Sequence, residues 1–90
     1  MQQRLLGEEH PEVAVNMSNV AYLLYAKGDY DDAEPIYRDV IAMEKKLLGE
    51  EHPAVAESLN SLAWLMHDKG DRAAALVLAR ESLAIKRSAP

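Results

Sequence analysis

Apolar residues recur along the chain every three to four positions, and glycine or proline interrupts the pattern at regular places. Such spacing puts apolar side chains on one face of an α-helix. Pro11 and Pro53 suit the first position of a helix, and Gly28 and Gly70 suit the residue after its last turn. The alternation typical of strands does not occur, so the pattern predicts an all-α fold. The predicted helices cover about 11–27, 30–48, 53–69 and 72–87.

The apolar stripes of these helices predict the core. In the first and third helices the stripes are Val13, Met17, Val20, Leu24 and Val55, Leu59, Leu62, Met66. In the second and fourth helices they are Ala33, Ile36, Tyr37, Val40, Met43 and Ala75, Leu78, Ala79, Ser82, Ile85. Ala21 and Ala63 lie on the same side as the first two stripes, and we expect these small residues to let neighbouring helices approach closely.

The second half of the chain repeats the first half. The segment from Leu5 to Pro11 returns unchanged as Leu47 to Pro53, at an offset of 42 residues, and the two halves share 17 of 42 aligned positions. A fixed period of this length is typical of stacked repeats. We therefore divide the chain into the tail of a preceding repeat helix and two repeat units. These three parts are residues 1–6, 7–48 and 49–90.

Composition narrows the classes of function. The chain has 90 residues, a formal net charge of −5 and no cysteine, which excludes disulfides and thiolate metal sites. A nucleic-acid partner needs a basic surface, so we expect none. No apolar run reaches the roughly 18 residues of a membrane span, and we expect no membrane partner and a cytoplasmic location.

Four segments of the chain resemble the tetratricopeptide repeat in the form that kinesin light chains typify. They are residues 6–11, 48–53, 33–38 and 58–63. The resemblance implies an α-solenoid of antiparallel helix pairs, a fragment of a tetratricopeptide superhelix. It also implies a scaffold that binds a protein or peptide in a concave groove lined by the first helix of each unit.

Helical spacing selects the residues that would line this groove, because residues three and four apart share a face. In the first unit they are Val15, Ser18, Asn19, Tyr22, Tyr25 and Ala26; in the second they are Glu57, Asn60, Ser61, Trp64, His67 and Asp68. Lysine and arginine do not occur at these positions. Family members that clamp a C-terminal carboxylate use basic residues there, so the resemblance does not support that activity in this chain.

Catalytic and metal-binding chemistry is not indicated. His10, His52 and His67 have glutamates nearby, but each copy of the repeated turn offers too few ligands for zinc. The serines do not lie in a glycine-flanked nucleophile turn, and no glycine-rich phosphate loop occurs. The sequence therefore predicts neither an enzyme nor a cofactor site.

Two other roles remain as alternatives to groove binding. The array could act as a spacer within a larger multidomain protein, and similar tandem units in bacterial signalling proteins suggest such a parent. The chain could also self-assemble, because its last helix carries more apolar residues than one packing face needs: Leu76, Val77 and Leu83. Copies would then form a homo-oligomer by end-to-end stacking or by exchange of helices.

Overall fold

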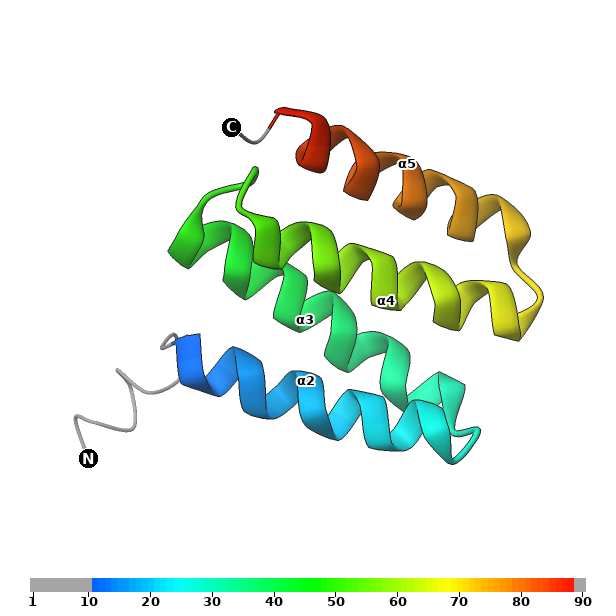
Figure 1. Cartoon of the computed structure of the whole chain (residues 1–90). Helices are drawn as coiled ribbons and strands as arrows, with labels where there is room; N and C mark the ends of the chain where they lie inside the picture. The colour runs from blue at the N-terminus through cyan, green and yellow to red at the C-terminus, as the bar shows by residue number, and fades with distance from the viewer. Residues whose placement is uncertain (1–10, 89–90) are drawn as a thin grey trace, which may run out of the picture.

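A computed structural model describes residues 11–88 of the chain, which fold into four α-helices (Figure 1). The helices are α2 (Pro11–Ala26), α3 (Tyr30–Leu48), α4 (Pro53–Lys69) and α5 (Arg72–Ser88). Figure 1 shows them side by side in chain order, with neighbours running in opposite directions. The all-α class and the antiparallel helix pairs are confirmed, and each predicted helix end lies within one residue of the observed end.

The predicted division of the chain into repeat units concerns residues 1–6 and the boundary between the two units. The predicted tail of a preceding helix at residues 1–6 lies outside the described residues. The boundary between the units at residues 48 and 49 stays a prediction.

Two glycines end the first helix of each pair in the same way. Gly28 and Gly70 have φ angles of +88° and +96°, a conformation that costs glycine little because it has no Cβ. The Gly70 N–H donates to the His67 carbonyl, and the Asp71 N–H donates to the Met66 carbonyl. Gly28 closes α2 with the equivalent pair of bonds. This arrangement satisfies carbonyls that the helix end would otherwise leave unpaired, and it turns the chain back for the next helix.

Helix α4 supplies the centre of the core. It packs against α3 on one side and α5 on the other. Eight of its residues are buried, and four of the five largest fully buried side chains belong to it: Val55, Leu59, Leu62 and Leu65. The predicted stripe of this helix is therefore confirmed.

The stripes of α3 and α5 are buried over most of their length. Ala33, Tyr37 and Val40 are buried in α3, and Leu78, Ser82 and Ile85 are buried in α5. The remaining predicted positions are half-buried: Ile36, Met43, Ala75 and Ala79. Ser82 is the polar member of its stripe, and its hydroxyl donates to the Ala56 carbonyl at 2.7 Å, which satisfies its hydrogen-bonding capacity inside the core.

The prediction for α2 is wrong at Val20. This side chain is 49% exposed, although the equivalent Leu62 of α4 is fully buried. Leu23 and Leu65 differ in the same way, with exposed fractions of 62% and 0%. The cause is the position of each helix in the stack. Ser58 and Lys69 share this face of α4 by helical spacing and bond to Glu44 and Glu34 of α3, whereas no described helix covers the same face of α2. Val13, Met17 and Leu24 are half-buried.

This difference predicts unequal effects of one substitution at two equivalent leucines. Leu65→Ala removes a fully buried side chain and leaves a cavity, so it should lower the free energy of unfolding by about 2–5 kcal/mol. Leu23→Ala changes an exposed side chain and should lower it by less than about 0.5 kcal/mol. Urea denaturation followed by circular dichroism, at low protein concentration, measures both. Equal effects would contradict the packing of α4 described above.

Candidate functional site

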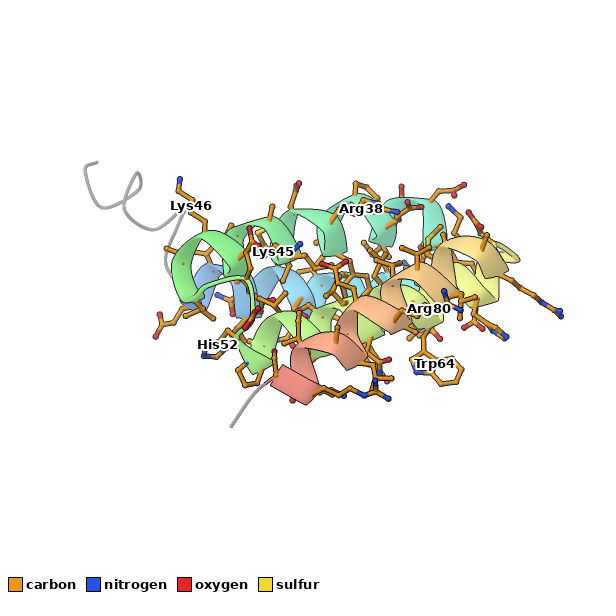
Figure 2. The ribbon with its side chains drawn as sticks, turned by 90° about the horizontal axis from the view of Figure 1, so that it is seen from above. Arg38, Lys45, Lys46, His52, Trp64 and Arg80 are labelled. Carbon is orange, nitrogen blue, oxygen red and sulfur yellow. The ribbon has the colours of Figure 1, made fainter. Side chains whose placement is uncertain are left out.

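Two large aromatic side chains are exposed at equivalent positions of α2 and α4. Tyr22 is 60% exposed and Trp64 is 58% exposed, and 42 residues separate them. Figure 2 shows the Trp64 side chain extending away from the helices. Exposed aromatic residues of this size are common anchors of binding surfaces.

A chain of side-chain contacts joins these two residues across the helices. The Tyr22 and Tyr25 rings have centroids 6.4 Å apart, and the Tyr25 hydroxyl donates a hydrogen bond to the Asp68 carboxylate. The Nδ1 atom of His67 lies 3.4 Å from the same carboxylate. The His67 ring then meets the Trp64 ring edge to face, with centroids 5.9 Å apart. We call these five residues the aromatic strip.

The hydrogen bond at the centre of the strip shifts two pKa values in opposite directions. It is the largest cause that raises the pKa of Tyr25 from 10.0 to about 12. It also holds the pKa of Asp68 below its ordinary value, and the contact with His67 lowers that pKa further. Asp68 is therefore ionised at neutral pH, and the strip carries a negative charge between its aromatic rings.

A hollow of about 520 Å³ adjoins one end of the strip. Its walls come from α4 and α5, and the residues that line it are Asn60, Ala63, Trp64, His67, Arg72, Ala75, Leu76 and Ala79. The predicted groove lies on the first helices alone and lacks the α5 wall. A signal was present, because Arg72, Ala75, Leu76 and Ala79 follow helical spacing and Ala79 stands where the first unit has the much larger Tyr37.

The predicted groove residues fall into two groups. The strip and the hollow together bring in Tyr22, Tyr25, Asn60, Trp64, His67 and Asp68. The others lie outside both features on the same two helices: Val15, Ser18, Asn19, Ala26, Glu57 and Ser61. Of these, Ser18 is half-buried and the rest are exposed. The Ser61 hydroxyl donates to the Glu57 carbonyl of its own helix at 3.2 Å.

The two histidines that the structure describes have local partners. The Nδ1 atom of His52 accepts a hydrogen bond from the Ala54 N–H at 3.0 Å, which caps the start of α4. His67 contributes to the aromatic strip, and His10 lies outside the described residues. Within residues 11–88, no three His, Cys, Asp or Glu side chains gather in a way that could hold a metal ion. Over the same range, no helix is both long and apolar enough to cross a membrane.

Comparison with known families identifies the class of protein. The model of the tetratricopeptide repeat family matches residues 1–46 and, in an overlapping second match, residues 13–88. The chain therefore belongs to the tetratricopeptide repeat family, whose members generally mediate protein–protein interactions and typically lack catalytic activity. Comparison with curated proteins finds no match.

The link between Tyr25 and Asp68 can be tested by titration. Tyr25→Phe removes the hydrogen bond, so the pKa of Asp68 should rise toward its ordinary value. In the wild-type chain the stabilising effect of the lowered Asp68 pKa is present above the ordinary aspartate pKa and is lost as the pH falls through the lowered pKa. The effect of the raised Tyr25 pKa is lost as the pH rises from about 10 to about 12.

NMR titration of the Asp68 carboxyl carbon measures the first shift directly. Tyr22→Phe is the matched control, since Tyr22 touches Tyr25 through its ring, and it should leave the Asp68 pKa in place. An Asp68 pKa that is the same in wild type and in Tyr25→Phe would contradict the proposed cause.

Proposed function

We propose that the chain is a protein-interaction module that binds a peptide or protein segment along α2 and α4. The observation that supports this most directly is the aromatic strip, which joins exposed side chains of both repeat units into one surface. A segment lying across the strip would contact Tyr22 and Trp64 together. The adjoining hollow offers room for a side chain of the partner between α4 and α5.

The charge of this surface selects the chemistry of the partner. The groove positions on α2 and α4 include the carboxylates Glu57 and Asp68 and no lysine or arginine, whereas α5 places Arg72 in the wall of the hollow. A guanidinium or ammonium group could pair with Asp68 and stack on the faces of Tyr22 or Trp64. We therefore propose a partner segment with basic and aromatic side chains, and not one that presents a free C-terminal carboxylate.

Self-association is a second proposal, and a separate observation favours it. Leu76, Val77 and Leu83 of α5, the last helix of the stack, are between 49% and 64% exposed. Apolar side chains exposed in this number tend to be covered by a partner. The spacer role remains the alternative to both proposals, and it predicts that function depends on the length of the array. The cytoplasmic location stays a prediction.

Selection from a random peptide library tests the groove proposal without a known partner. Peptides selected on the immobilised chain should be enriched in arginine, lysine and aromatic residues. Trp64→Ala should weaken binding of each selected peptide by about 1–3 kcal/mol, because Trp64 is the largest exposed anchor of the strip. Fluorescence anisotropy with labelled peptides measures the loss.

Arg80→Ala is the control for this experiment, because it truncates a long exposed side chain of α5 that lies outside both the strip and the hollow. Its peptide affinity should equal that of the wild type. A selection that yields no binder, or peptides that bind Trp64→Ala as tightly as the wild type while the helix content is unchanged, would contradict the groove proposal and favour the spacer role.

A further inference from the structure

The contact between the two units shows which surface of one unit packs against the first helix of the next. Helix α4 buries Leu62 and Leu65 in a cluster that also holds residues of α2 and α3. The members of that cluster contributed by the first unit are Ala21, Ala33, Tyr37 and Ile41, each less than 10% exposed. We call these four positions the receiving face of the first unit.

The second unit repeats this receiving face, and no helix among residues 11–88 packs on it. The equivalent residues, 42 positions later, are Ala63, Ala75, Ala79 and Leu83. Leu83 is 49% exposed, whereas the equivalent Ile41 is 7% exposed under α4. Ala75 and Ala79 are half-buried and, with Ala63, line the hollow of about 520 Å³. The hollow therefore lies where a helix equivalent to α4 would pack.

The chain also carries the helix face that fits this position. In α4, Ser58, Leu62 and Leu65 share one face by helical spacing, and the Ser58 hydroxyl on that face donates to Glu44 of α3 at 2.7 Å. The equivalent residues of α2 are Val20, Leu23 and Asn16. All three are exposed. We call them the docking face of α2.

We propose that copies of this chain associate head to tail, with the docking face of α2 in one copy packed on the receiving face of α4 and α5 in the next. This inference rests on the self-association proposed above and specifies its mode. Both faces are already formed in the folded chain, so stacking needs no helix pair to open, as exchange of helices would. Because the two faces differ, the contact is heterologous and leaves one of each free, so copies can add in open chains.

The polar contacts of the internal interface are only partly available between copies. Lys69 of α4 pairs with Glu34 and Asp31 of α3 at 2.8 and 2.9 Å. Lys27 stands at the equivalent position of α2, but Leu76 and Ala73 replace the two acids. Head-to-tail packing therefore depends mainly on apolar contact. It should be weaker than the internal interface, whose two sides are also joined by the chain.

Comparison with the residues 42 positions earlier in α3 shows that the three exposed apolar residues of α5 do not all lie in the proposed contact. Leu76 lines the hollow, and Leu83 belongs to the receiving face. Val77 corresponds to Pro35, which stays exposed although α4 packs on the first unit. Val77 thus lies outside the proposed contact and supplies a control of matched hydrophobicity.

Sedimentation velocity of the 90-residue chain and three variants tests the proposal. The wild type should form species larger than a dimer as its concentration rises. Leu23→Glu on the docking face and Leu83→Glu on the receiving face should each weaken association by at least about tenfold, because each buries a charge in an apolar contact. Val77→Glu should associate like the wild type.

A mixture of Leu23→Glu and Leu83→Glu gives the sharpest result. Each variant keeps one intact face, so the pair should form a 1:1 dimer that grows no further, although each variant alone is monomeric. Circular dichroism checks that both are folded. If Leu23→Glu loses helix content, Val20→Lys places a charge on the docking face in its stead. If Leu83→Glu loses helix content, Leu76→Lys places a charge in the hollow of the receiving side, where its ammonium would also face Lys27 of the next copy.

Each other outcome overturns a defined part of the proposal. A wild-type chain that stays monomeric at high micromolar concentration would refute self-association altogether. If Leu23→Glu and Leu83→Glu both associate as strongly as the wild type, or if their mixture forms no dimer, the head-to-tail mode is refuted. Self-association would then occur by another route. Loss of association in Val77→Glu would show that a different face of α5 is used.

Discussion

The packing of α4 between α3 and α5 is the contact on which the other features of the structure depend. Eight residues of α4 are buried, compared with four of α3 and three of α5. Because α4 lies against both neighbours, it holds the two helix pairs together as one stack. The same packing brings Asp68 to Tyr25 and so connects the exposed aromatic residues of the two units. Stability and the candidate binding surface therefore share one cause.

Equivalent residues of the two units have different environments because their neighbours differ. Leu65 of α4, which packs between two helices, is fully buried, whereas Leu23 of α2 is 62% exposed and has no described helix over it. Ile41 is covered by α4, whereas Leu83 is half exposed. Each end of the stack therefore presents one half of an interface that the middle of the stack has already formed. The groove runs along the first helices and the end faces lie across the stack, but both include the hollow between α4 and α5, so a docked copy and a bound partner would compete for it.

The sequence predicted the features that depend on local chemistry. Proline, glycine and apolar spacing act within one helix, and they located every described helix to within one residue. Features that need two helices were harder to predict. The exposure of Val20 depends on which helix lies beside α2, and the hollow appears only when α5 sets Ala75 and Ala79 against α4. Spacing placed Tyr25 and Asp68 on one surface, but only the crossing of the helices brings them into contact.

Native-state hydrogen exchange, measured at low protein concentration where copies do not associate, tests the central role of α4 most directly. The helix that buries the most residues opens only with the whole fold, so its amides exchange slowest. We expect the slowest amides between Val55 and Met66, with faster exchange in α2 and in the last turns of α5. Amides of α2 that exchange as slowly as those of α4 would contradict this account, because they would place the centre of stability in the first helix pair.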